Sequence, residues 1–435
     1  MGRARSAFLA ARTEFPPMRV LFTPYSARSH VYNMAPLAWA LATAGHEVRL
    51  SCHPDETEWV QAAGLTAVPV GRELRVAELM RRPEVLDGIH HDIAEDRPER
   101  LTHDYVHGVF QWYTEALFRN VTDEDTMDEL AAFARWWRPD LVVWDPLNLS
   151  GPVAARVAGA AHARLLFGLD FGARMRRVFH DLSRQRPPRA RHDPLGEWLA
   201  ATLARHGHPF DEEIVLGQWS IDPMPSRMRF PEDLTYVPVR YVPFNGPGPL
   251  PPWLHHDPGR PRVCLTLGLS GRELFGEDGI AITDLLAGMA DLDVEVVATL
   301  DARQLTDVRA LPDNVRVIDF VPLRALLPTC AAVIHHGGAT TYGTAVAAGV
   351  PQLVVYTKVW DKAAVAQDVA RHGAGLAVDV DVVTVADVRD GVRRLVTEDS
   401  FAAGARHLRQ QLLAAPAPSD IVPTLERLTA RHRPT

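Results

Sequence analysis

Apolar runs alternate with amphipathic stretches along the first half of this chain. The run MRVLFTP, which begins at Met18, predicts a buried strand, NMAPLAWALATAG predicts a helix that ends at Gly45, and HEVRLSC predicts the next strand. Further along, RPDLVVWD predicts another strand and SGPVAARVAGA another helix. Strands that alternate with helices are typical of a parallel sheet with helices on its faces, so the first half is expected to be one doubly wound domain.

A second alternating series follows a break in the pattern. Residues 236–261 are dense in proline and glycine, which is typical of a linker. The later apolar runs are RVCLTLGLS, VEVVATL, VRVIDFV, AAVIHHG, PQLVVY and GAGLAVD, and helices are expected near 277–290, 340–348 and 361–372. The pattern therefore predicts an α/β protein with two doubly wound, Rossmann-like domains that face a central cleft, where ligands bind at the carboxyl ends of the strands.

The expected boundaries follow from these breaks. We expect a mobile arm at residues 1–17, a first domain at 18–235 and a second domain at 262–415. Residues 416–435 are expected to form a C-terminal helix, for which a return to the first domain stays open.

Length and composition agree with this organisation and argue against several classes of protein. A chain of 435 residues with 47% hydrophobic and 23% charged content is too long for a single core. The net charge of -8 argues against a nucleic-acid-binding protein, because such binding uses basic patches. The only two lysines, Lys358 and Lys362, do not follow a glycine, so the chain has no G-x-x-x-x-G-K-[ST] phosphate loop.

The cysteines and the hydropathy pattern favour a cytoplasmic protein. Cys52, Cys264 and Cys330 are far apart and form no C-x-x-C pair, which is typical of a reducing compartment. The first 22 residues contain no apolar core long enough for a signal peptide. No uncharged apolar span of about 18 residues follows, so we expect no membrane insertion.

Two segments have a biased charge. Residues 84–129 contain 13 acidic and 3 basic residues, and they predict either a solvated helical face over a buried stripe or an insertion that contacts a ligand or a partner. The apolar and aromatic residues of this segment are Ile89, Val106, Phe110, Trp112, Tyr113, Leu117 and Phe118. The arginine-rich segment RMRRVFHDLSRQRPPRAR, residues 174–191, is expected to be loop or surface helix, and its opposite charge permits pairing with the first segment.

The stretch IHHGGATTYGTAV carries candidate binding chemistry. A turn between a strand and a helix presents free backbone N–H groups and the positive end of the helix dipole, which suits a phosphate. Gly337 and Gly338 allow close approach of the backbone. Thr340 and Thr341 can donate hydroxyl hydrogen bonds, and His336 can add a hydrogen bond or a positive charge. We expect a diphosphate bound without metal at this turn; the alternative is an ordinary glycine-containing turn with incidental histidines.

The order of several motifs resembles one family. The motifs PLAWALATAGHEV, RPDLVVWDPL, AAHARLLFG, RYVPFNGP, PRVCLTLGLSGREL, DFVPLRALLP, IHHGGATTYGTAV and GVPQLVVYTKVWD stand in the order found in nucleotide-sugar-dependent glycosyltransferases of the two-domain GT-B type. More specifically, the chain resembles actinobacterial enzymes that attach deoxysugars to macrolides and related polyketides, from residue 19 to about 380. The resemblance implies a GT-B fold and the inverting transfer of a deoxysugar from a thymidine diphosphate (TDP) sugar to a polyketide hydroxyl in antibiotic biosynthesis.

The resemblance assigns the catalytic residues to the first domain. The histidine that deprotonates the acceptor hydroxyl in the family matches His30, in the strand-to-helix loop SARSHVYNMAP. An imidazole titrates near neutrality, so it can accept a proton at working pH. Asp145, at the end of LVVWD, matches a carboxylate that orients this histidine. Taken alone, His30 would be an ordinary loop histidine and Asp145 a turn or helix-capping residue.

The donor side falls on the second domain. The family places the nucleotide base against the positions of Phe320 and Val321, which would flank thymine or uracil, and it places the sugar hydroxyls against Asp361. The implied diphosphate contacts are His336, Gly337, Gly338, Thr340 and Thr341, with Ser270 and Arg272 closing from an adjacent loop. Taken alone, these positions would be a strand end, a surface arginine and the start of a helix.

Two positions depart from the family pattern. Thr340 replaces a glycine of H-H-G-G-x-G-T, so a side chain stands where the backbone approaches the phosphate most closely. Lys362 replaces the glutamine that follows the aspartate in relatives that use fully hydroxylated sugars, which fits a deoxygenated sugar.

Partners and alternative activities stay open. Some macrolide members of this group act only with an auxiliary protein that resembles a haem-free cytochrome, and residues 84–129 are the candidate contact for it or for the aglycone. The alternatives are a transferase for another aglycone, such as an anthracycline or an enediyne, a sugar-nucleotide 2-epimerase, or a non-catalytic sugar-nucleotide-binding protein. No cofactor beyond the TDP-sugar co-substrate and no metal are expected, and the oligomeric state is not indicated.

Overall fold

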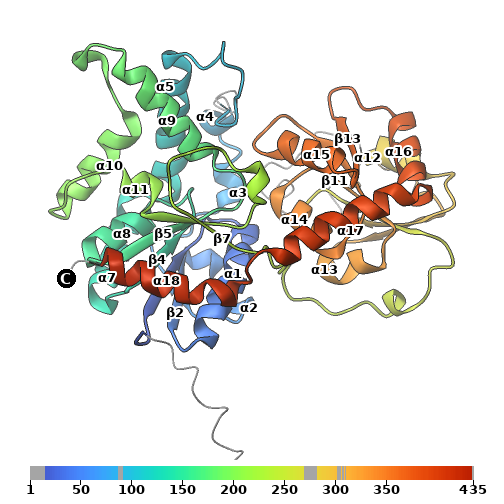
Figure 1. Ribbon diagram of the computed structural model, residues 1–435, viewed down its shortest axis with the longest axis horizontal. Helices are drawn as coiled ribbons and strands as arrows, with labels where there is room; N and C mark the ends of the chain where they lie inside the picture. The colour runs from blue at the N-terminus through green and yellow to red at the C-terminus, as the bar shows by residue number, and fades with distance from the viewer. Residues whose placement is uncertain are drawn as a thin grey trace, which may run out of the picture.

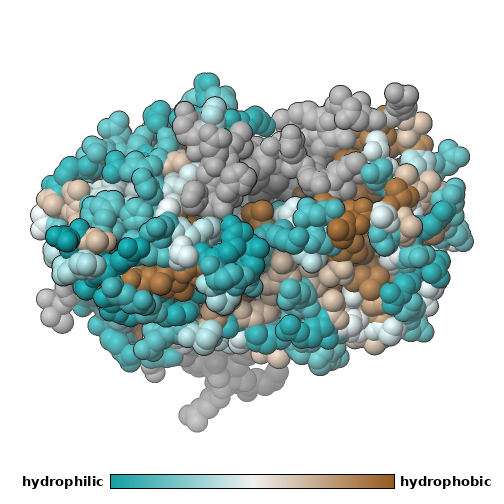
Figure 2. Space-filling view, turned by 90° about the horizontal axis from the view of Figure 1, so that it is seen from above, coloured by the Kyte–Doolittle hydropathy of each residue, from teal (hydrophilic) through white to brown (hydrophobic). Residues whose placement is uncertain are grey.

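The computed structural model describes residues 15–86, 92–268, 282–300, 305, 308 and 310–433. Within these ranges the chain forms two lobes that lie side by side, each built around a parallel sheet with helices on its faces (Figure 1). The predicted α/β architecture with two doubly wound sheets is confirmed. Most of the surface shown in Figure 2 is hydrophilic, and hydrophobic residues reach it in separate patches. None of the helices in the described ranges is long and apolar enough to span a bilayer.

The first sheet has, in the described part of the chain, seven strands in the order β3-β2-β1-β4-β5-β6-β7. They are β1 (Arg19–Thr23), β2 (Glu47–Cys52), β3 (Ala67–Pro69), β4 (Leu141–Trp144), β5 (Ala161–Leu165), β6 (Trp219–Asp222) and β7 (Tyr236–Pro238). All of these strands pair in parallel. The strand order reverses between β1 and β4, and the crevice at such a switch point is where open sheets bind ligands.

The edge strand of this sheet lies inside the stretch that the sequence assigns to the linker. Tyr236–Pro238 form β7, in which Tyr236 pairs with Ser220 of β6. Proline is tolerated at an edge because its missing N–H is not needed there, so the proline-rich composition concealed a short strand. The connection to the second lobe therefore begins after Pro238.

The longer helices of the first lobe cover both faces of its sheet. The helices are α1 (Arg28–Thr43), α2 (Thr57–Ala62), α3 (Val76–Leu79), α4 (Pro83–Leu86), α5 (His103–Trp112), α6 (Arg119–Val121), α7 (Glu124–Trp137), α8 (Ser150–Ala158), α9 (Phe171–Arg184), α10 (Pro194–Arg205) and α11 (Glu213–Leu216). Helix α1 begins at Arg28, earlier than the sequence suggests, and it passes through Pro36. Because a proline is usually found in the first turn, it displaced the expected start of this helix. His30 consequently lies in the first turn of α1 and not in a loop.

The acidic and aromatic segment forms helices with one buried face. α5 and the π-helix η3 (Tyr113–Phe118) bury the apolar stripe, whose members Val106 and Phe118 are 0% and 6% exposed. The acidic residues Asp104 and Glu124 are exposed. These residues form a solvated face over a buried stripe, and the alternative of a ligand or partner contact stays open; Ile89 lies outside the described residues.

The arginine-rich segment is partly buried, which corrects the expectation of a loop or surface helix. Residues 174–184 belong to α9, and Arg176 is fully buried there. Its guanidinium binds Asp193 at 2.6 Å and Glu212 at 2.8 Å, and these two carboxylates compensate the buried charge. Arg186 makes the permitted contact with the acidic segment, through Asp104 at 3.2 Å.

The second sheet repeats the topology of the first. Over the described residues it has six strands in the order β10-β9-β8-β11-β12-β13, with a reversal between β8 and β11. The strands are β8 (Arg262–Thr266), β9 (Glu295–Thr299), β10 (Val315–Ile318), β11 (Ala332–His335), β12 (Gln352–Tyr356) and β13 (Gly375–Asp379). The helices are α12 (Ile282–Met289), α13 (Leu323–Leu326), α14 (Ala339–Ala348), α15 (Lys362–Arg371), α16 (Val385–Thr397) and α17 (Asp399–Ala414).

The C-terminal helix returns to the first lobe. α17 lies along the second lobe, and α18 (Pro418–His432) lies along the first (Figure 1). Ile421 and Leu425 join the apolar core beneath α1. Glu426 lies 3.2 Å from Nε2 of His46, and both side chains are buried. The end of the chain is thus anchored to the first lobe by apolar packing and by one polar contact.

A segment of the first lobe also docks on the second. Met224 and Met228 pack against Tyr342 of α14 and its neighbours. Between them, Arg227 binds the carboxylate of Asp368 with two hydrogen bonds of 2.7 and 2.9 Å. The hydroxyl of Tyr342 donates to the same carboxylate at 2.7 Å. This joint ties the two lobes together beside the cleft.

Candidate active site

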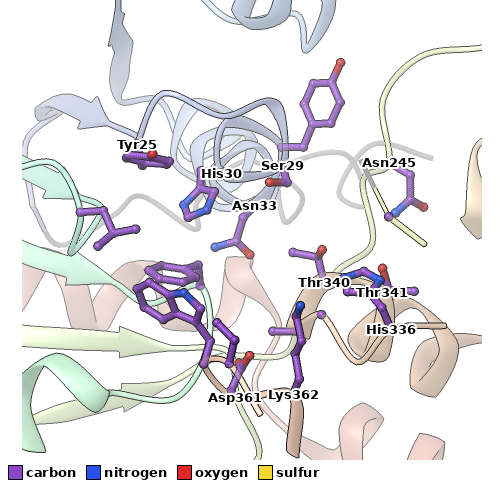
Figure 3. A pocket seen from close by; sticks show the side chains of 18 of the residues that line it. Tyr25, Ser29, His30, Asn33, Asn245, His336, Thr340, Thr341, Asp361 and Lys362 are labelled. Carbon is purple, nitrogen blue, oxygen red and sulfur yellow. The ribbon is translucent and has the colours of Figure 1, made fainter. Parts of the chain in front are cut away.

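A cavity of about 300 Å³ lies between the two lobes, at the switch points of both sheets. Its size is at the lower end of ligand pockets, which span about 300–1,000 Å³. One wall comes from the start of α1 and the loops after β4 and β5. The opposite wall comes from the turn after β11 and from the starts of α14 and α15 (Figure 3).

His30 and Asp145 meet at the wall formed by the first lobe. They follow β1 and β4, which are neighbouring parallel strands, and this register brings the two residues together. Nδ1 of His30 lies 2.7 Å from Oδ2 of Asp145, whose side chain is 1% exposed. The other carboxylate oxygen accepts the N–H of Leu147 at 2.9 Å. The carboxylate accepts a hydrogen bond from Nδ1–H, so Nε2 is the nitrogen that can take a proton.

Two aromatic rings hold the imidazole of His30 in place. The ring of Tyr25 is 5.1 Å away in an edge-on arrangement, and that of Phe167 is 4.6 Å away. Burial and the neighbouring charge of Asp145 raise the pKa of Tyr25 well above its usual value. Tyr25 is therefore a neutral phenol, and it does not compete with His30 as a base.

The glycine turn after β11 is braced by the first of its two histidines. His335 is fully buried, and its Nε2 lies 2.9 Å from the amide oxygen of Gln352. Its Nδ1 accepts the N–H of Gly337 at 3.1 Å. Burial lowers the pKa of His335 to about 4, so the side chain is neutral. Gly337 has φ of 90°, a conformation that glycine adopts without strain.

The start of α14 presents unpaired amides to the cavity. Gly338 is the N-terminal capping residue, and the first helical hydrogen bond joins the N–H of Tyr342 to the Gly338 carbonyl. The amides of residues 339–341 precede this bond and lie at the positive end of the helix. Gly338, Thr340 and Thr341 line the cavity (Figure 3). This arrangement suits an anion such as phosphate.

His336 differs from its expected charge state. Burial lowers its pKa to about 3, and the neighbouring Lys362 and His335 add to the effect. The sequence allowed a positive charge here, but a neutral imidazole can offer only a hydrogen bond. Its Nδ1 is buried without a partner among the described residues, and His336 lines the cavity. A buried nitrogen of this kind is available to a bound ligand.

Lys362 is the cation of this wall. It is the first residue of α15, and its ammonium group lies 3.1 Å from Oγ1 of Thr357. Figure 3 shows the amino group pointing into the cavity beside Thr340. Among the described residues that line the cavity, Lys362 is the only lysine or arginine.

Phe320 and Val321 form an apolar part of the cavity lining. They follow β10, and both line the cavity. Val321 is 2% exposed, and the ring of Phe320 packs so closely on the linker that a side chain at Gly248 would lie 2.9 Å from it. The role that the resemblance implies for these two residues, a contact with the nucleotide base, stays a prediction.

Asp361 lies where the two lobes meet. A side chain on Gly168, in the loop after β5, would lie 2.4 Å from its Oδ2, and the N–H of Leu169 donates to this carboxylate. Burial raises the pKa of Asp361 to about 6. Its neighbour Trp360 has a positive φ of 57° and packs 5.8 Å from the ring of Phe167. Asp361 lines the cavity while the first lobe holds its carboxylate.

Two predicted site residues lie outside the described ranges, and several residues that line the cavity were not predicted. Ser270 and Arg272 lie outside the described residues. Asn33, one turn after His30, lines the cavity and donates to the carbonyl of Leu166 at 3.1 Å. The sequence analysis missed it because it placed the start of α1 too late; a helix from Arg28 puts Asn33 on the face of His30. Trp112 and Tyr113 of the aromatic lining belong to the segment that the sequence offered as a ligand contact, whereas Phe167 and Trp360 were missed.

Metal-binding side chains do not gather in the part of the chain that the structure describes. No three His, Cys, Asp or Glu residues are grouped there in a way that could hold a metal ion.

Comparison with known proteins places the chain in one family. The N-terminal and C-terminal domains of the family described as erythromycin biosynthesis protein CIII-like match residues 39–268 and 283–428. The aclacinomycin-T 2-deoxy-L-fucose transferase of Streptomyces galilaeus is 52% identical over 96% of this chain and 97% of its own length. The 10-deoxymethynolide desosaminyltransferase of Streptomyces venezuelae is 46% identical over 96% of this chain and 98% of its own length.

The solved structures agree with these relatives. The crystal structure of the glycosyltransferase VinC in complex with dTDP superposes with a TM-score of 0.86 at 45% identity, over 95% of this chain and 100% of that chain. The likeness extends across both lobes. The chain therefore belongs to the erythromycin biosynthesis protein CIII-like family, and it is a glycosyltransferase with the GT-B fold.

Proposed function

We propose that this enzyme transfers a deoxysugar from a TDP-sugar to a hydroxyl group of a polyketide aglycone, with inversion at the anomeric carbon. The observation that carries the proposal is that the His30–Asp145 pair and the unpaired amides at the start of α14 face each other across one cavity (Figure 3). A base on one wall and an anion site on the other are the two parts that this reaction needs. The relatives named for deoxysugar transfer support the same reading.

The first lobe performs the proton transfer in this proposal. Nε2 of His30 takes the proton of the acceptor hydroxyl while the acceptor oxygen forms a bond to the anomeric carbon. Asp145 stabilises the imidazolium that results. The bond from the anomeric carbon to the phosphate oxygen breaks on the opposite face, and its electron pair leaves with TDP. No covalent intermediate with the enzyme forms.

The second lobe binds the donor in this proposal. Phe320 and Val321 flank the base, and the amides at the start of α14 bind the diphosphate together with Thr340 and Thr341. Neutral His336 contributes a hydrogen bond through its unpaired nitrogen. Such preorganised donors act on the charge that develops on the leaving group, at about 3 kcal/mol for each well-placed one.

Asp361 completes the described part of the donor site in this proposal. The second carboxylate oxygen of Asp361 binds a sugar hydroxyl at the edge of the cavity. Ser270 and Arg272, which lie outside the described residues, are proposed from the resemblance alone as further diphosphate contacts.

The aromatic lining bears on the choice of acceptor. The sequence points to a macrolide or a related polyketide, with an anthracycline as the alternative. The rings of Trp112, Tyr113, Phe167 and Trp360 surround the space next to His30, and flat aromatic surfaces favour a planar aromatic acceptor through stacking. We therefore place planar aromatic polyketides beside macrolides in the set of acceptors to be tested.

The test is an assay of TDP-deoxysugars against macrolide and anthracycline aglycones, read by mass spectrometry. We expect a product heavier by one deoxysugar residue. His30→Gln should lower kcat by about 100- to 10,000-fold, the usual contribution of a general base, while TDP affinity stays within about twofold. Product formation by His30→Gln at the rate of the wild type would contradict the proposed role of His30. Donor alone should be returned unchanged, and appearance of an epimerised sugar would favour a 2-epimerase instead.

The proposal includes an auxiliary activator protein and excludes a metal requirement. The acidic outer face of residues 103–129 is the surface that we assign to the activator, because its apolar stripe is buried and its charged side is exposed. Turnover should rise when the activator is supplied, and it should not change when EDTA is added. Equal turnover with and without the activator would remove the partner, and loss of turnover in EDTA would show a metal.

A further inference from the structure

We propose that the ammonium group of Lys362 binds the phosphate that is attached to the sugar, the β-phosphate of the TDP donor and of the TDP product. In this role Lys362 supplies the positive charge that the departing diphosphate requires. The inference rests on the proposed function, since it concerns how the same donor site binds its ligand.

The position of Lys362 places its charge beside the phosphate turn. Lys362 begins α15, and Gly337 lies directly against it, because a side chain on Gly337 would lie 3.2 Å from Cβ of Lys362. The aliphatic part of the lysine therefore runs along the glycine turn. Its amino group ends inside the cavity, next to Thr340 and the start of α14 (Figure 3). An anion held by the amides of that helix lies within reach of this cation.

The charges of the described residues around the cavity favour a role for this cation. A diphosphate is multiply charged, and the partial positive charge of a helix end is about half an elementary charge. His336 is neutral, since burial lowers its pKa to about 3. Among the described residues that line the cavity, Lys362 is the only side chain that carries a permanent positive charge. An ammonium group is also a common phosphate ligand in proteins.

The hydrogen bonds of the amino group are compatible with this role. The amino group donates a hydrogen bond to Oγ1 of Thr357 at 3.1 Å. Thr357 lies in the loop after β12, and its contact directs the side chain of Lys362 toward the start of α14. The lysine is thus held in position before the ligand arrives.

The chain provides a matched control for this residue. Lys358, the other lysine, is four residues earlier, and its side chain is 66% exposed. It pairs with Asp379 at 2.8 Å and with Asp381 at 3.1 Å, outside the cavity. The same substitution at both lysines removes one charge from the same protein, and only one of the two charges faces the proposed phosphate.

The experiment compares thymidine monophosphate (TMP) with TDP as ligands in calorimetric titrations. The two differ by the β-phosphate alone. Wild type should bind TDP more tightly than TMP. Lys362→Met, which keeps the unbranched apolar part of the side chain, should weaken TDP binding by about 10- to 100-fold, as expected for a charge-assisted hydrogen bond, and should leave TMP binding within about twofold. Lys362→Arg should recover part of the TDP affinity, and Lys358→Met should match wild type for both ligands.

The outcomes separate this inference from the proposed function. If wild type binds neither TDP nor TMP, the proposed function fails before Lys362 is at issue. If wild type binds both ligands equally, or if Lys362→Met keeps the preference for TDP, the role of Lys362 is wrong while the proposed function stands. Equal loss of TDP and TMP binding in Lys362→Met would show a structural role for the lysine. Retained TMP binding also shows that the variant is folded.

Discussion

Asp361 is a buried carboxylate between the two lobes, and its pKa is raised from the usual value of 3.8 to about 6. The folded protein therefore binds this proton more tightly than the unfolded chain does. The contribution of the group to stability is present at low pH and is lost as the pH rises from about 4 to about 6. The difference between the two pKa values corresponds to about 3 kcal/mol as an upper limit.

Asp361→Asn tests this pH dependence. The amide cannot ionise, so the variant should gain stability relative to wild type as the pH rises through 5 and 6. We expect the difference between the two melting temperatures to grow over this interval and to be constant above about pH 7. Melting curves at half-unit steps from pH 4.5 to 7.5 provide the measurement. A difference that does not vary with pH would show that Asp361 is ionised at its ordinary pKa in the folded protein.

Residue identities could be predicted from the sequence, but their charge states could not. The motif containing His336 and Gly337 was found from its letters and from the pattern of a strand followed by a helix. The neutral state of His336 depends on how closely Gly268 and Gly338 pack against its ring, which is a matter of distance between segments far apart in the sequence. The same holds for Asp361, whose burial comes from Gly168 of the other lobe.

The start of α14 is the proposed binding site of the donor diphosphate, and Gly337 lies in the turn that leads into it. Gly337→Ala places a methyl group at φ of 90°, close to Lys362. Gly373→Ala is the matched control, because Gly373 also has a positive φ, of 61°, but a side chain there meets no atom within 4 Å. Both variants should lose about 1–2 kcal/mol through left-handed strain.

TDP affinity should separate these two glycine variants. Only Gly337→Ala should weaken TDP binding, by tenfold or more, since it displaces the turn that carries the amides of α14. Fluorescence-based melting and calorimetric titration of each variant supply the two readouts. The same TDP affinity in both variants would mean that the turn is not the phosphate site.

The sequence predicted the elements better than their ends. The strands of the second sheet and the helices beginning near residues 340 and 361 follow the apolar periodicity closely. The starts of α1 and β7 did not follow it, because Pro36 lies within a helix and Pro238 ends an edge strand. In both cases tertiary packing overrides a local signal from proline. The late predicted start of α1 made the prediction of the site incomplete, because the true start determines where His30 and Asn33 point.

The joint between Arg227 and Asp368 links the two lobes, and we expect it to make them unfold as one cooperative unit. Arg227→Met should lower the melting temperature and should broaden or split the unfolding transition, because the lobes lose their charged contact. The matched control is Arg229→Met, since Arg229 pairs at 2.8 Å with Asp222 inside the first lobe. Calorimetry should show one transition for that control. A single sharp transition for Arg227→Met as well would show that apolar contacts alone couple the lobes.

A double variant extends this test. Arg227→Met combined with Asp368→Asn should lose little more stability than either change alone, because the two side chains act through the same contact. Additive losses would mean that each side chain stabilises its own lobe independently.

The overall architecture of two facing sheets followed from alternation alone, whereas the joint did not. The contact between residues 227 and 368 joins positions 141 residues apart, and the hydrophobic periodicity of either segment does not predict it. The relative placement of the lobes, and with it the cavity, therefore had to come from the structure.

The return of α18 to the first lobe has a consequence for engineering. Over the described residues the polypeptide passes to the second lobe after β7 and comes back before α18. A chimera that borrows its donor half from a relative must be spliced at both crossings, with the native tail kept. A fusion with a single junction would pack a foreign α18 against the native core beneath α1. The resulting loss of folded protein could be mistaken for a failure to accept the substrate.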